Sequence, residues 1–148
     1  MACAEASPRL LSLHAVNAAD EVLDALVRHG LTRRCACVFH WFSGSSEQLQ
    51  RAIGAGCWFS VGARILTTRR GRSYARAIPE DRLLLETDLP SVPGAAEGWP
   101  EIKAALREAL VELERIRGRS LAPRLAVASA QLLGMGEGIS EPGPPLCG

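Results

Sequence analysis

The stretch that decides the fold is Cys35-Ala36-Cys37-Val38-Phe39-His40, a short apolar run that ends on a histidine. A run of this length with β-branched and aromatic residues predicts a strand buried on both faces, as in parallel sheets. Similar runs lie on either side, at residues 10–14, 57–61 and 82–87. Helical patterns separate them, so we expect four parallel strands in sequential order, joined by right-handed helical crossovers.

The segments between these runs carry helix signals. Residues 17–29 read as an amphipathic helix that Gly30 ends in a left-handed conformation. Four apolar residues of this segment fall on one predicted face: Val22, Leu23, Leu26 and Val27. Ser45 and Gln48 have the spacing of a capping box, which predicts a helix ending at 54 or 56. An Arg-rich stretch at 67–78 reads as a weaker helix.

The C-terminal part of the chain has a different character. Pro100 suits the first turn of a long helix that runs to Arg117 and ends at Gly118. A second helix is predicted at 122–133. From 134 onward the sequence has no apolar period, so we expect one α/β domain over 1–133 and a flexible tail over 134–148.

Composition excludes several classes of protein. The chain has 148 residues, of which 47% are hydrophobic and 22% charged, so it is neither disordered nor collagen-like. The net charge of +1 gives no bulk argument for a polyanionic partner. No apolar run approaches the roughly 20 residues that span a bilayer. Five cysteines without CxxC spacing argue against a disulfide framework or a zinc ribbon, and we expect a cytoplasmic protein with no membrane partner.

Polar residues stand at the ends of three apolar runs, namely His14, His40 and Asp88. Ligands and catalytic groups gather at the carboxyl ends of parallel strands. About one βα unit of roughly 30 residues separates the two histidines, and about two such units separate His40 from Asp88. Two imidazoles and a carboxylate at one rim suit a divalent metal. The alternative is that each residue only hydrogen-bonds within its own loop.

Three ordered motifs resemble the TatD family. They are His40-Trp41-Phe42-Ser43-Gly44-Ser45, Gly56-Cys57-Trp58-Phe59-Ser60 and Ile78-Pro79-Glu80-Asp81-Arg82-Leu83-Leu84-Leu85-Glu86-Thr87-Asp88-Leu89-Pro90. The resemblance covers residues from about Leu10 to Leu133. It implies a TIM-barrel-type (β/α) fold and a metal-dependent hydrolase, a deoxyribonuclease, that uses Mg²⁺, Mn²⁺ or Zn²⁺ to cleave phosphodiester bonds in DNA.

The resemblance assigns roles to individual residues. It implies that His14 and His40 are metal ligands and that Asp88 is a metal ligand and the catalytic residue that orients the attacking water. Ser43 matches the turn that shapes the substrate rim, while Glu86 and Thr87 match as supporting groups. Two further rim residues are suggested by their chemistry. Trp41 can stack on a base or pack over the rim, and Arg64 can contact phosphate or belong to a solvated basic helix face.

The chain also departs from the family pattern. It contains three histidines, none in the family's H-x-H, and it lacks the glutamate in a G-E-x-G-L-D context. It therefore resembles only the last four βα units of an eight-unit barrel, which indicates either a truncated sequence or a real half-barrel. Open sheet edges predict self-association or pairing with a missing N-terminal half. The alternative function is a catalytically inactive, degenerate half-barrel that acts as a metal-binding or interaction module.

Overall fold

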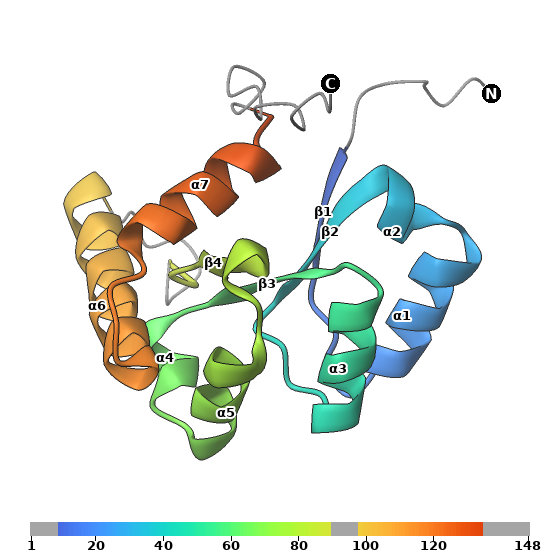
Figure 1. The fold of residues 1–148 in the computed structure, drawn as a ribbon, viewed down its shortest axis with the longest axis horizontal. Helices are drawn as coiled ribbons and strands as arrows, with labels where there is room; N and C mark the ends of the chain where they lie inside the picture. The colour runs from blue at the N-terminus through green and yellow to red at the C-terminus, as the bar shows by residue number, and fades with distance from the viewer. Residues whose placement is uncertain (1–8, 90–97, 135–148) are drawn as a thin grey trace, which may run out of the picture.

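The structure, a computed structural model, describes residues 9–89 and 98–134 (Figure 1). Its centre is a four-stranded parallel sheet in the order β1-β2-β3-β4. The strands are β1 (Arg9–Leu13), β2 (Cys35–His40), β3 (Trp58–Val61) and β4 (Leu83–Leu85). This sheet confirms the prediction of four sequential parallel strands, a partial barrel of the TIM type.

Helices connect the strands and extend the chain beyond β4 (Figure 1). Their bounds are α1 (Ala19–Arg28), α2 (Leu31–Arg34), α3 (Ser46–Gly54), α4 (Ala63–Leu66), α5 (Arg69–Ala77), the 3-10 turn η1 (Glu80–Arg82), α6 (Trp99–Arg117) and α7 (Ala122–Leu132). The last two are the C-terminal helices that the sequence predicts.

Several local signals act as the sequence indicates. The Ser45 hydroxyl accepts from the Gln48 backbone N–H at 3.1 Å, and the Gln48 side chain accepts from the Ser45 backbone N–H at 2.7 Å. This reciprocal box satisfies two backbone donors that the first turn of a helix leaves free. Gly30 and Gly118 have φ values of 64° and 69°, the left-handed geometry of helix ends.

The predicted helix at 67–78 is confirmed as α5, which Thr68 caps by accepting from the Gly71 backbone N–H at 2.9 Å, whereas the short helix α4 before it was not predicted. One detail of the predicted helices is wrong. Val27 is 51% exposed, although its periodicity placed it on the buried face of α1. Leu23 and Leu26 do face the core, because only that narrower stripe of the helix meets the sheet.

The two faces of the sheet differ because side chains alternate along each strand. Phe39, Phe59 and Leu83 belong to the main core, which α1, α3, α4 and α5 cover. On the other face Val38, Trp58 and Leu84 pack with Ala128 of α7.

Two residues further along each strand, that second face becomes polar, with His40, Ser60 and Glu86. The second face therefore has an apolar floor and a polar rim at the carboxyl ends of the strands.

Cys37 and Cys57 are buried as free thiols and Cys35 is partly buried, as their place in apolar strands indicates. Among the described residues, no helix combines the length and apolarity needed to cross a membrane. The predicted tail over 134–148 lies outside the described residues except for Gly134.

Candidate metal and nucleic-acid site

The predicted strand-end residues meet at one rim of the sheet. His14 follows β1, His40 is the last residue of β2, and Asp88 lies just beyond β4. The imidazole ring centroids of His14 and His40 are 5.4 Å apart. The His40 Nε2 atom lies 3.6 Å from Asp88 Oδ1. Parallel pairing thus brings together residues that are far apart in the chain.

The backbone at this rim adopts an uncommon conformation. Three described non-glycine residues have positive φ, Asn17 at 53°, Trp41 at 48° and Asp88 at 55°. Each follows the end of a strand by a few residues. Non-glycine residues adopt the left-handed region at a cost, and such residues cluster at functional sites. At Asp88 this geometry accompanies a side chain that is 47% exposed and accessible to solvent.

A buried carboxylate lies beneath His40. The Glu86 side chain is 10% exposed, and its Oε2 atom contacts His40 Nδ1 and accepts a hydrogen bond from Ser60 Oγ at 2.5 Å. The Glu86 backbone N–H donates to Val61 O at 3.0 Å and so extends the pairing of β3 with β4. The family resemblance implies only a supporting role for Glu86, although its two-residue spacing from Leu84 places it on the same sheet face as Ser60 and His40.

Two donor atoms at the rim, His40 Nε2 and Asp88 Oδ1, are spaced as two ligands of one divalent metal ion would be. Imidazole nitrogen and carboxylate oxygen are common ligands of zinc and manganese. Two ligands that each lie about 2.1 Å from one tetrahedral ion are roughly 3.4 Å apart, close to the 3.6 Å between His40 Nε2 and Asp88 Oδ1. Within residues 9–89 and 98–134, no group of three or more His, Cys, Asp and Glu side chains is arranged to hold an ion.

Two of the predicted substrate-rim residues, Trp41 and Arg64, lie next to this pair, whereas Ser43 lines a different pocket. The Arg64 guanidinium stacks over the Trp41 ring at 5.2 Å from its centroid. Both residues line a pocket of about 250 Å³ whose lining includes Glu86 and Asp88. Ser43 contributes its backbone carbonyl, which accepts from Arg70 at 3.3 Å. The pocket therefore joins a cationic aromatic surface to the acidic end of the candidate site.

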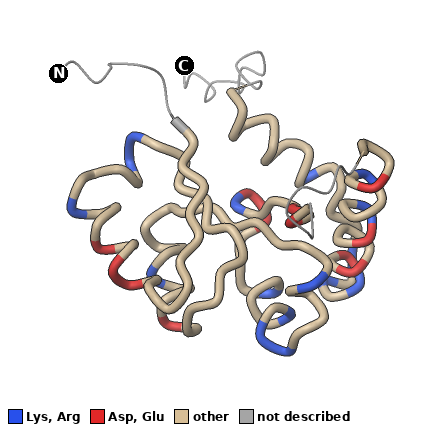
Figure 2. The backbone as a smooth tube through the Cα atoms, turned by 180° about the vertical axis from the view of Figure 1, so that it is seen from behind, with Lys and Arg blue, Asp and Glu red and all other residues tan. Residues whose placement is uncertain are grey.

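Some arginines around α5 hold the backbone in place, and others are exposed to solvent. Figure 2 shows Lys and Arg gathered along α4 and α5, whereas both signs alternate along α6. Arg72 hydrogen-bonds to the carbonyls of Leu66 and Thr67, at 3.2 and 2.7 Å, and so caps the end of α4. Arg69 and Arg76 are exposed. Part of this cluster is therefore structural.

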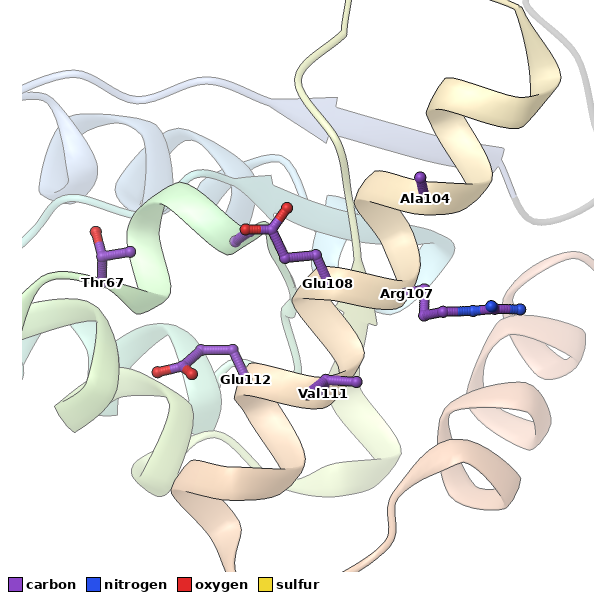
Figure 3. Close-up of a pocket in the computed structure, with 7 residues that line it drawn as sticks. Thr67, Ala104, Arg107, Glu108, Val111 and Glu112 are labelled. Carbon is purple, nitrogen blue, oxygen red and sulfur yellow. The ribbon is translucent and has the colours of Figure 1, made fainter.

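A second pocket, of about 460 Å³, adjoins the first between α4 and α6 (Figure 3). Its side chains include Thr67, Arg107, Glu108, Val111 and Glu112, and Glu108 also lines the smaller pocket. Figure 3 shows Glu108 and Glu112 extending to one side of α6 and Arg107 to the other, so the pocket presents carboxylates and not a phosphate site. None of the predicted site residues lines this larger pocket.

The fold and the rim define a class of protein, a (β/α) barrel-type chain whose strand ends present imidazoles and carboxylates. Comparison with known families names it more closely. The model of the family described as "TatD related DNase" matches residues 1–132, and the chain belongs to this family.

Individual relatives agree with this assignment. The chain is 36% identical over 109 residues to the uncharacterized metal-dependent hydrolase YjjV of Escherichia coli K12, covering 70% of this chain and 41% of that protein. It is 37% identical over 81 residues to the 3'-5' ssDNA/RNA exonuclease TatD of Klebsiella pneumoniae, covering 53% of this chain and 30% of that protein. The chain thus spans less than half the length of these curated relatives.

Solved structures show the same fold. The crystal structure of the Escherichia coli homologue YjjV aligns with a TM-score of 0.64 and 27% identity, over 83% of this chain and 49% of that chain. A TatD family hydrolase from Entamoeba histolytica aligns with a TM-score of 0.67 over 83% of this chain and 50% of that chain. At 15% identity the second match shows the fold alone.

Proposed function

We propose that this chain contributes the carboxyl-terminal half of a divalent-metal-dependent phosphodiesterase site that acts on DNA. The observation that carries the proposal is the 3.6 Å approach of His40 Nε2 to Asp88 Oδ1, with the His14 ring beside it. The family supports the chemistry, since relatives are named as an exonuclease acting on single-stranded DNA and RNA and as a deoxyribonuclease in Schizosaccharomyces pombe.

His40 and Asp88 would hold a metal ion, which would be Mg²⁺, Mn²⁺ or Zn²⁺, and the adjoining His14 would join them in the completed site. When bound, such an ion supplies Lewis-acid activation of the phosphodiester and of the attacking water. The half-exposed Asp88 carboxylate would orient that water and accept its proton.

Trp41 and Arg64 would bind the nucleic acid beside this carboxylate. The Trp41 ring offers a stacking surface for an unpaired base, and the Arg64 guanidinium offers a contact for backbone phosphate. Both residues line a pocket of about 250 Å³ together with Asp88, and a phosphodiester bound in it would lie next to the acidic end of the site. The small size of this pocket favours a strand end over an intact duplex.

A complete site needs donors that the chain does not contain. Its sequence has no H-x-H and no G-E-x-G-L-D segment. In the described sheet, β1 and β4 are edge strands with one unpaired side each. Unpaired strand edges are templates for further pairing. We therefore propose that a family-type N-terminal half, or a second copy of this chain, pairs at these edges.

Hydrolysis of a labelled single-stranded DNA oligonucleotide tests the function. With Mn²⁺, the chain of residues 1–148 alone should stay near background, and co-expression with a family-type N-terminal half should raise the rate. Asp88→Asn should remove this gain, whereas Asp81→Asn, which changes an exposed carboxylate away from the rim, should retain it. Equal rates for the Asp88 and Asp81 variants would contradict the proposal.

A second candidate function is a metal-binding or interaction module without catalysis. It is favoured by one observation, the lack of the family's H-x-H and G-E-x-G-L-D segments in this sequence. Under this alternative the complemented protein binds Mn²⁺ and its partner half, but no oligonucleotide is cleaved. The same experiment therefore separates the two functions.

A further inference from the structure

Glu86 follows β4, and pairing of its backbone with β3 fixes its carboxylate beneath the rim that carries His40 and Asp88. Its backbone N–H bonds to Val61 O at 3.0 Å, which holds the residue in register with β3. Its side chain is 10% exposed, so it cannot turn out into solvent without leaving the sheet face that it shares with Ser60. The position of the carboxylate is thus set by the backbone and by packing.

The hydrogen-bond partners of Glu86 do not fully compensate the cost of burying its carboxylate, so a stabilising role does not explain its position. Removing a carboxylate from water is costly unless a cation or several donors compensate. Within the described residues, no Arg or Lys forms an ion pair with Glu86, and its side-chain partners are Ser60 and His40. Its second oxygen, Oε1, is buried and has no hydrogen-bond donor among those residues. An incompletely compensated carboxylate at a rim pocket points to a functional constraint.

The contact between Glu86 and His40 bears on which ring nitrogen of His40 carries the proton. His40 Nδ1 contacts Glu86 Oε2, and in a neutral ring that donates to this oxygen the single ring proton is on Nδ1. Nε2 then presents a lone pair toward Asp88 Oδ1, 3.6 Å away. Two electron-rich atoms at this distance are complementary to a cation between them. A carboxylate behind a metal-binding histidine sets its tautomer and orientation in the same way.

We propose that Glu86 is a positioning residue that holds His40 in the Nδ1–H tautomer, with Ser60 fixing the carboxylate that does so. Ser60 Oγ donates to the same oxygen that faces His40, which limits rotation of the carboxylate. The role of the tautomer in binding a metal rests on the proposed function. The tautomer itself does not, because it is a property of the chain without metal or DNA.

The tautomer can be read directly by long-range ¹H–¹⁵N correlation NMR of the full chain, recorded as the pH is raised until the His40 ring is neutral. The chain has three histidines, so His40→Gln assigns the signal of interest and the exposed His29 serves as an internal reference. The wild-type chain should show His40 protonated on Nδ1. A His40 ring protonated on Nε2 would overturn the proposal, whatever the behaviour of the Glu86 variants.

Two substitutions of Glu86 distinguish the effect of its hydrogen-bond acceptor from the effect of its negative charge. Glu86→Leu removes the acceptor while filling the space, and His40 should shift to the Nε2–H form. Glu86→Gln keeps a carbonyl that can accept from Nδ1, and His40 should retain the wild-type tautomer. If His40 keeps the Nδ1–H form in the leucine variant, Glu86 does not set it.

Mn²⁺ titration of the same proteins adds a readout of binding. Glu86→Leu should weaken the affinity by about 10- to 100-fold, and Glu86→Gln should weaken it less. Equal affinities in the two variants would overturn the positioning role. If the wild-type chain binds no Mn²⁺, the proposed function fails, and the NMR comparison still decides whether Glu86 orients His40.

Discussion

Replacing Gly71 with alanine should destabilise the protein, although the same change in an ordinary helix would stabilise it. Gly71 lies in α5, where the helix passes close to α4. A Cβ atom on this residue would lie 1.9 Å from the Ile65 carbonyl oxygen and 2.9 Å from Ile65 Cγ1. A non-bonded carbon and oxygen cannot approach that closely, so the two helices must separate.

Two opposing terms set the magnitude. The higher helix propensity of alanine contributes up to about 1 kcal/mol in favour of the variant. Overpacking of a close contact costs about 1–3 kcal/mol, and more when backbone must move, as the Ile65 carbonyl must here. The clash is with backbone rather than with a flexible side-chain end, so we expect a net loss of about 2 kcal/mol. For a chain of this size that corresponds to a melting temperature lower by roughly 5–10 °C.

Urea unfolding followed by circular dichroism measures the change, and Gly54→Ala is the matched control. Gly54 is the last residue of α3, and a Cβ atom there would meet nothing within 4 Å. That variant should be as stable as the wild type or up to about 1 kcal/mol more stable. If the two alanine variants had equal stability, the close contact between α4 and α5 would not exist as described.

Three further predictions rest on single groups. Backbone hydrogen bonds from Leu121 and Ala122 lower the pKa of Glu114 below 4.5, so its stabilising effect is present above pH 4.5 and is lost as pH falls through the lower value. Glu114→Gln should therefore lower the urea midpoint at pH 7 and have a smaller effect at pH 3. Burial raises the pKa of Cys57 to about 12, so peptide mapping should find it unmodified by iodoacetamide at pH 8 until urea unfolds the chain. Tyr74→Phe should lower the unfolding free energy by about 1–2 kcal/mol, because the Tyr74 hydroxyl donates to the Gly44 carbonyl next to the rim turn; an unchanged urea midpoint would argue against this contact.

Most of the sheet could be predicted from the sequence because each strand is a short apolar run between turn signals. The run at 35–40 is one strand with those bounds, and the remaining runs differ from the observed strands at their ends. The meeting of His40 with Asp88 could also be predicted, because parallel strands present their carboxyl ends at one edge. These inferences use local pattern and topology alone.

Other features depend on contacts that the sequence pattern does not contain. Glu86 faces His40 and Ser60 because of the register between neighbouring strands, and the motif alone gave no partner for it. The break between α4 and α5 follows from the cap that Thr68 forms and from the close approach of Gly71 to Ile65. Periodicity cannot show which part of a helix face meets a neighbour.

The stacking of Arg64 on Trp41 is a second example of the same limit. The basic cluster after β3 allowed either phosphate contact or a solvated helix face, and composition did not distinguish among its members. The structure separates Arg72, which caps α4, from Arg64, which lines the pocket beside Asp88. Side-chain placement of this kind follows from tertiary packing rather than from local pattern.

Isothermal titration with Mn²⁺ tests whether His40 and Asp88 share one metal site. The wild-type chain should bind one ion weakly, because few protein donors leave coordination positions to water. His40→Gln and Asp88→Asn should each weaken binding by at least tenfold, while His29→Gln, which changes an exposed histidine outside the rim, should leave the affinity unchanged. Equal affinity in all four proteins would place any bound ion elsewhere and contradict the account.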